Sequence, residues 1–131
     1  MAVLNLSMPR RFRRRWFPPS SPQQNKLLHY VRFLYPTAAR NHRVRIVGMR
    51  KSRWVDIGIV ERKIAIEYQG QAYHNSPTAR ARDKIRTKEL ETMGWVVIFV
   101  DKYNWKWFLA NMREIIERTT VERKSLYPSS T

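Results

Sequence analysis

The sequence predicts an α/β domain built on a mixed sheet. Apolar and polar residues alternate on both sides of Glu61-Arg62, which is typical of two antiparallel strands. Apolar residues with helical spacing lie before and after this hairpin. The nearly continuous apolar run 95–100 is typical of a strand buried on both faces. The predicted order is helix, three strands, helix, strand and helix, and 131 residues suffice for one domain.

The first predicted helix begins at Ser21 and Pro22, because serine can cap a helix and proline suits its first position. An apolar stripe with helical spacing follows, formed by Leu27, Leu28, Val31 and Leu34. The helix ends at Tyr35, since a residue before proline disfavours the helical conformation. The next segment, HRVRIVG, predicts an edge strand with Arg43 and Arg45 facing outward.

The most informative segment runs from Trp54 to His74 and predicts two strands joined by a tight turn. A turn centred at Glu61-Arg62 places Asp56 directly opposite Glu67. The core side of this hairpin is predicted to consist of Val55, Ile57, Ile59, Ile64, Ile66 and Tyr68. The other side carries two carboxylates among small or polar neighbours, namely Asp56, Gly58, Ala65, Glu67 and Gln69.

These facing carboxylates predict a bound cation. Directly opposed strand residues have Cβ atoms roughly 4.5–5.5 Å apart, and like charges at this distance destabilise a sheet. The repulsion is on the order of 3–4 kcal/mol at an effective dielectric constant of about 20. A divalent metal with oxygen ligands would offset it, so we expect Asp56, Glu67 and the backbone carbonyl of Tyr68 to hold one.

The second half of the chain predicts a helix, a buried strand and a last helix. The second helix begins at Ser76-Pro77 and ends near Met93. Its outward face is expected to carry Arg80, Arg82, Lys84, Arg86 and Lys88. The last helix begins near Asn104, and its aromatic start is either an interface or ordinary core and rim packing, at Trp105, Trp107 and Phe108. The predicted boundaries are a basic, flexible arm over 1–20, one domain over 21–124 and a flexible tail over 125–131.

Positive charge dominates the first part of the chain. The formal net charge is +16, and no acidic residue precedes Asp56. This asymmetry predicts a polyanionic partner, and DNA is the expected one. The residues expected to bind DNA are Arg10, Arg11, Arg13, Arg14, Arg15, Arg43, Arg45, Arg50, Lys51, Arg53, Arg80 and Lys84.

Two alternatives remain for these cations. The arm could be a tail with only nonspecific affinity, and the basic edge strand could simply prevent aggregation. Membrane binding is not expected, because the sequence has neither an apolar run of about 20 residues nor an amphipathic basic helix. The chain lacks cysteine, which excludes disulfides and thiolate zinc sites and fits an intracellular location, in a cell or in the host of a virus.

Three further polar residues follow the carboxylates in sequence. Gln69 can orient a water or a phosphate oxygen. His74 suits proton transfer, although a lone histidine is often structural. Asp83 either pairs with Arg80 or Arg86, or orients His74 or holds a second metal through water. The absence of P-loop, G-x-G-x-x-G, H-E-x-x-H and G-x-S-x-G motifs argues against nucleotide hydrolysis, dinucleotide redox chemistry and serine hydrolysis.

One predicted strand carries an aspartate, and the next carries an acidic residue, then any residue, then a polar residue. This pattern resembles that of the PD-(D/E)xK nuclease superfamily. Within it, IAIEYQGQAYH and ARDKIRTKELETMGWVVIFV resemble the very short patch repair endonuclease and the EDxHD homing endonucleases. They also resemble small domains with an IEvDGxxH…R…D..R…L…G(W/I)xV pattern. The resemblance covers residues 21–100 and implies a restriction-endonuclease-like core, with a mixed sheet flanked by helices.

The resemblance implies a DNA endonuclease that uses Mg²⁺, or Mn²⁺ in its place. Asp56 and Glu67 match the metal ligands, and His74 and Asp83 match active-site residues of the repair-endonuclease branch. The chain departs from the family pattern at two positions. Gln69 replaces the usual lysine. Gln24, which we expect to be an accessory residue of the site, lies where the family often has a glutamate. They leave open a noncatalytic DNA-binding module on the same fold. Within the enzymes, a homing nuclease, a mismatch nickase and a dimeric junction resolvase remain alternatives.

Overall fold

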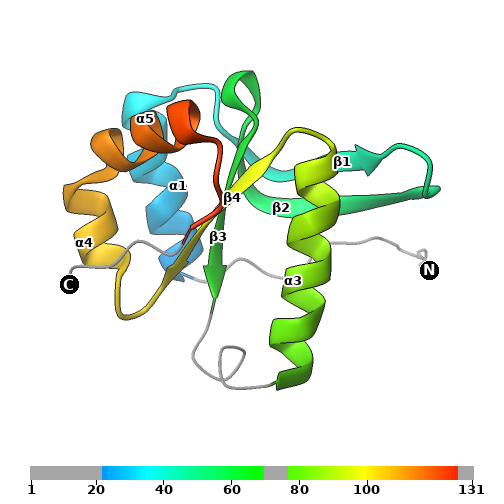
Figure 1. The fold of residues 1–131 in the computed structure, drawn as a ribbon. Helices are drawn as coiled ribbons and strands as arrows, with labels where there is room; N and C mark the ends of the chain where they lie inside the picture. The colour runs from blue at the N-terminus through cyan, green and yellow to red at the C-terminus, as the bar shows by residue number, and fades with distance from the viewer. Residues whose placement is uncertain (1–21, 70–76, 127–131) are drawn as a thin grey trace, which may run out of the picture.

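A computed structural model describes residues 22–69 and 77–126 (Figure 1). The elements are α1 (Pro22–Leu34), β1 (Ala39–Ile46), β2 (Lys51–Ile59), a 3₁₀ turn (Val60–Arg62), β3 (Ile64–Gln69), α3 (Pro77–Thr92), β4 (Val96–Asp101), α4 (Trp105–Ala110) and α5 (Met112–Glu122). The strands lie in the order β1-β2-β3-β4, with antiparallel pairs except for the parallel β3–β4 pair. This part of the chain is therefore an α/β fold with a four-stranded mixed sheet and four helices, as predicted.

Helices cover both faces of the sheet. In Figure 1, α3 lies on one side of β3 and β4, while α1, α4 and α5 lie on the other. The larger core forms between the sheet and α1, α4 and α5, and includes Ile57, Ile66 and Phe108. The smaller core lies beneath α3 and includes Ala65 and Leu90. All six residues of β4 are buried, which confirms the prediction of a strand covered on both faces.

The predicted register of the central hairpin is confirmed. Its paired residues are Ile57 with Ile66, Gly58 with Ala65 and Ile59 with Ile64. Continuing this register by one residue places Asp56 opposite Glu67. The register follows from the tight turn after β2, where Lys63 takes the left-handed conformation that closes the 3₁₀ turn.

The predicted alternation fails at one residue of β2. Val55 packs in the core beneath α3, whereas Ile57 packs on the opposite face, so the two do not share a face as predicted. The β1–β2 ladder pairs Arg40 with Ile57 and His42 with Val55 but omits Asn41 and Asp56. Asn41 has a φ of 48°, a left-handed conformation, and lies directly opposite Asp56, where the alternation of β2 changes side.

The last helix and the tail also differ from the predictions. The helix is divided at Asn111, whose side-chain amide donates to the Trp107 carbonyl at 2.9 Å. At its aromatic start, Phe108 is fully buried and Trp105 packs against the same core, which favours core and rim packing. Ser125 and Leu126, predicted to be in the flexible tail, instead bond to β4. Within the described ranges, none of the helices has the length and apolar character needed to cross a membrane.

We predict that Gly58→Ala destabilises the fold by about 1–3 kcal/mol, the usual cost of overpacking. A Cβ atom at this position would lie 2.9 Å from the Cβ of His42, which stacks on Trp95. Urea unfolding measures the effect. In a His42→Gly background the same substitution should cost markedly less, and an equal cost in both backgrounds would contradict the steric explanation.

Candidate active site: two carboxylates and an arginine

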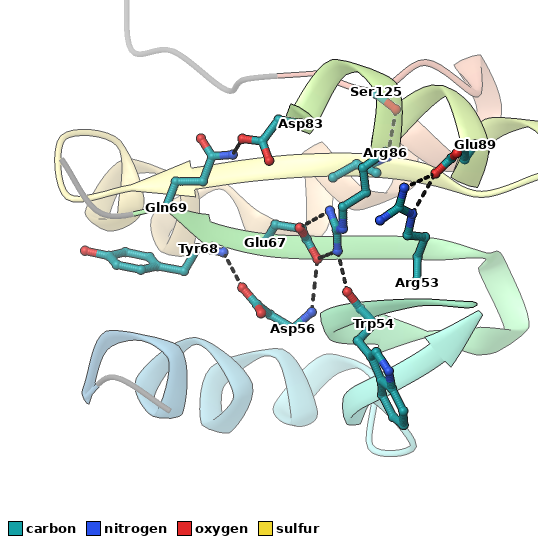
Figure 2. Close-up of polar contacts among 11 residues, drawn as sticks. Arg53, Trp54, Asp56, Glu67, Tyr68, Gln69, Asp83, Arg86, Glu89 and Ser125 are labelled. Atoms are coloured by element: carbon teal, nitrogen blue, oxygen red, sulfur yellow. Dashed lines mark hydrogen bonds and ion pairs between the residues drawn. The ribbon is translucent and has the colours of Figure 1, made fainter. Parts of the chain in front are cut away.

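Asp56 and Glu67 contact each other's strands where the β2–β3 ladder ends (Figure 2). The Asp56 amide donates to Glu67 Oε2 at 3.1 Å, and the Tyr68 amide donates to Asp56 Oδ2 at 3.0 Å. Each carboxylate thus accepts a backbone hydrogen bond from the opposite strand. The two side chains predicted to be neighbours are therefore brought together. Their hydrogen bonds take the place of backbone–backbone hydrogen bonds between β2 and β3 at this point.

The carboxylates do not share one open face, however. Figure 2 shows Glu67 directed toward α3 and Asp56 toward α1. Glu67 pairs with Arg86 of α3, and Asp56 accepts a hydrogen bond from the side chain of Gln24 in α1. This corrects the prediction of two carboxylates side by side among small residues. The shift of alternation at Asp56 accounts for the difference, because it turns this side chain away from the face that carries Ala65.

Arg86 occupies the place beside Glu67 that the sequence predicted for a cation. Its Nη1 lies 2.5 Å from Glu67 Oε1 and its Nη2 lies 2.8 Å from Glu67 Oε2, so the ion pair is bidentate. Arg86 Nη2 also donates to the backbone carbonyl of Trp54. Both side chains are largely buried, with exposures of 18% for Arg86 and 9% for Glu67. A guanidinium therefore neutralises the carboxylate in this structure.

The prediction that Arg86 lies on the outward face of its helix is wrong. Residues 79, 83, 86 and 90 form the inner stripe of α3: Ala79 and Leu90 are buried, and Asp83 and Arg86 contact β3 side chains. Their spacing is that of an ordinary buried helix face. This spacing could have identified Arg86, but the four other cations nearby suggested a uniformly solvated helix.

Burial sets the protonation chemistry of the two carboxylates. Burial raises the pKa of the Asp56 carboxyl above its usual value, while the Tyr68 amide, Gln24 and Arg86 oppose the rise. Burial also raises the pKa of Glu67, and the charge of Asp56 adds to this rise, while Arg86 opposes it. Both carboxylates are therefore poorly solvated, and a nearby cation stabilises their charged forms.

Gln69 and Asp83 form a second polar contact at the end of β3. Gln69 is buried, and its Nε2 donates to Asp83 Oδ2 at 2.5 Å. Asp83 also lies near enough to Arg86 to raise the arginine pKa, together with Glu67 and Asp56, against the lowering effect of burial. His74 lies outside the described residues, so the predicted contact between His74 and Asp83 stays a prediction.

The cations predicted to bind DNA fall into separate groups. Lys51 and Arg53 face α3, where each pairs with Glu89, at 2.5 and 2.6 Å. Arg43, Arg45 and Arg50 line an open groove on the other face of the hairpin. Arg80 and Lys84 lie on the exposed part of α3. The predicted arm residues, Arg10, Arg11, Arg13, Arg14 and Arg15, lie outside the described ranges.

The donor set at this site fits a metal in its chemistry but not in its present arrangement. Carboxylate and carbonyl oxygens, as at Asp56, Glu67 and Tyr68, are the ligands that Mg²⁺ prefers. Arg86, however, engages both oxygens of Glu67, and the cavity beside Asp56 is about 10 Å³, close to the space of one water. In residues 22–69 and 77–126, no three or more His, Cys, Asp or Glu side chains gather around a common point suited to a metal. Metal binding would require Arg86 to leave Glu67.

Comparisons of this chain with protein-family models, with curated proteins and with solved structures find no match.

We predict that Arg86→Ala lowers the free energy of unfolding by about 3–5 kcal/mol, because it leaves the buried Glu67 carboxylate without its partner. Arg82→Ala is the matched control, since Arg82 is an exposed arginine of the same helix. Its effect should stay within about 0.5 kcal/mol. Chemical denaturation of the two variants tests the prediction, and similar stability losses would show that the ion pair is not structural.

Proposed function

We propose that this protein is a metal-dependent DNA endonuclease that hydrolyses phosphodiester bonds. Its proposed active site contains Asp56 and Glu67. The observation that carries this proposal is the reciprocal contact of the two carboxylates, each bonded to the backbone of the other's strand. Two desolvated acids at one point are costly to the fold, and such groups concentrate at functional sites. The net charge of +16 supports DNA as the substrate.

The resemblance to PD-(D/E)xK nucleases adds further support. Four residues that the resemblance assigns to the site form two hydrogen-bonded pairs at the end of the hairpin. Gln24 is hydrogen-bonded to Asp56, and Gln69 is hydrogen-bonded to Asp83. In the proposed site Gln69 orients water, and Asp83 holds Gln69 in place. His74 is proposed to transfer a proton to or from water or the leaving oxygen.

Mg²⁺ held by Asp56, Glu67 and the Tyr68 carbonyl would polarise the scissile phosphate and lower the pKa of a bound water. Arg86 has a separate role in the proposal. Once it leaves Glu67, its guanidinium is the cation best placed to bind a phosphate oxygen near the carboxylates. Arg86 thereby supplies the positive charge that lysine contributes in the superfamily and that Gln69 cannot contribute.

The Arg86–Glu67 ion pair also favours a second candidate, a noncatalytic DNA-binding module. In that case Arg86 permanently neutralises Glu67, and the pair only stabilises the fold. The module would bind DNA with a steep salt dependence but would not cut it. A dimeric junction resolvase is a variant of the enzyme proposal, and gel filtration with a branched-DNA cleavage assay separates it from a monomeric nickase or homing enzyme.

The endonuclease proposal predicts that the protein nicks or cuts DNA in Mg²⁺ or Mn²⁺ and not in EDTA. Asp56→Asn and Glu67→Gln should each lower the cleavage rate at least about a hundredfold, because each removes a charged metal ligand. Glu114→Gln is the control, since Glu114 pairs with Arg118 on the exposed face of α5. Circular dichroism checks the fold of each variant, and cleavage that survives both site substitutions would refute the site.

The two candidates also differ in how Mg²⁺ affects stability. If Asp56 and Glu67 bind the ion, Arg86→Ala should bind it more tightly than the wild type, because the competing guanidinium is gone. Titration calorimetry should then show tighter Mg²⁺ binding, and millimolar Mg²⁺ should raise the melting temperature of this variant by several degrees. The noncatalytic module predicts no such change, and Glu67→Gln should abolish the effect in the Arg86→Ala background.

A further inference from the structure

The β1–β2 hairpin has two chemically different faces. Val44, Ile46 and Val55 pack beneath α3, and Lys51 and Arg53 on the same face pair with Glu89 of that helix. The alternating positions on the opposite face hold Arg43 and Arg45 of β1 and Ser52 and Trp54 of β2. The register places Arg43 directly opposite Trp54, and Arg45 directly opposite Ser52. Figure 1 shows that this hairpin extends beyond α3.

The opposite face forms an open groove of about 680 Å³. Its lining contains four cations, a serine and a tryptophan but no carboxylate: Arg43, Arg45, Arg50, Lys51, Ser52 and Trp54. In the part of the chain that the structure covers, Arg43, Arg45 and Arg50 form no ion pair with an acidic side chain. Three of the four cations that line the groove are therefore not compensated by an acidic side chain of the described residues, whereas the fourth, Lys51, pairs with Glu89.

Trp54 adds an aromatic surface to this charge. Its side chain is 48% exposed, and Figure 2 shows it directed away from α3. An arginine and a tryptophan at directly opposed strand positions can contact a phosphate and the neighbouring base together. A tryptophan ring stacks on a base only when one face of that base is open, and duplex bases are already stacked on both faces. The combination thus favours an unpaired strand over a duplex.

The groove is joined to the carboxylate site through the backbone of β2. The Trp54 carbonyl accepts a hydrogen bond from Arg86, which pairs with Glu67. Asp56 follows Trp54 by two residues, a distance of roughly 7 Å along a strand. Both side chains lie on the side of β2 away from α3 in Figure 2. A base stacked on Trp54 would therefore place an adjacent phosphate close to the carboxylates.

We propose that this groove binds an unpaired DNA strand, with a base stacked on Trp54 and the phosphates held by Arg43, Arg45 and Arg50. The inference rests on the proposed endonuclease function and names its substrate class. That class is DNA with an unpaired segment beside the cleavage point, as in a flap, a bubble or a branched junction.

The test measures binding of the full chain in EDTA, where no cleavage is needed. The probes are a fluorescently labelled oligo-dT of 20 nucleotides and a 20-base-pair duplex, compared by anisotropy. Trp54→Ala should weaken oligo-dT binding about tenfold and change duplex binding less than twofold, because only the single strand loses stacking. Trp54→Phe should retain most of the affinity. Arg43→Ala should weaken the binding of oligo-dT. It should also reduce the slope of log affinity against log salt concentration by the amount expected for about one phosphate contact.

Phe33→Ala is the matched control, because Phe33 is a 69% exposed aromatic residue on α1, outside the groove, and its loss should leave both affinities unchanged. Equal effects of Trp54→Ala on the two DNAs, or no effect on either, would overturn the assignment. Because the assay is independent of cleavage, a negative result leaves the endonuclease proposal standing. Conversely, selective loss of single-strand binding combined with no Mg²⁺-dependent cleavage would overturn the endonuclease proposal alone.

Discussion

The arrangement of the site depends on how the protein stabilises two carboxylates at facing strand positions, the buried Glu67 and the partly buried Asp56. Asp56 and Glu67 stand where the β2–β3 ladder ends, and each accepts a backbone amide from the opposite strand. Amide dipoles alone do not compensate two desolvated charges. Arg86 supplies a positive charge from α3 to Glu67, so this helix and the sheet are joined by one ion pair beside the two carboxylates.

This constraint explains how the basic residues are divided. Arg86 is committed to Glu67, and Lys51 and Arg53 are committed to Glu89, so these three cations connect the sheet to α3. Such pairs position elements, and their cost in desolvation is offset only while each acid keeps its partner. Arg43 and Arg45 stand at the alternate strand positions and have no such acid opposite them. The pleat of the hairpin thus separates structural cations from those available to a ligand.

The sequence contains enough information for the element order and the hairpin register, because both follow from local patterns. The tight turn after Ile59 fixes the pairing, and the alternation of isoleucines fixes which face is buried. The same patterns fail where a long-range contact decides the outcome. The side change at Asp56 coincides with a left-handed residue, Asn41, in the neighbouring strand, and the inward-facing Arg86 pairs with an acid 19 residues away. Periodicity along α3 indicates that position 86 lies on the buried face, but it does not identify Glu67 as the partner, and the alternation along β2 does not reveal the side change at Asp56.

In the proposed endonuclease, the charge balance at Glu67 would link substrate binding to metal binding. A guanidinium and a divalent ion about 4 Å apart repel by roughly 8 kcal/mol at an effective dielectric constant of 20, twice the value for two unit charges. Arg86 and a dication would therefore compete for Glu67, and additional negative charge at the site would weaken this competition. In the proposed function, a DNA phosphate would supply that charge and offer Arg86 a bidentate partner equivalent to the carboxylate it leaves. The same Arg86–Glu67 ion pair that connects α3 to the sheet would then favour metal binding only when a nucleic-acid backbone is present.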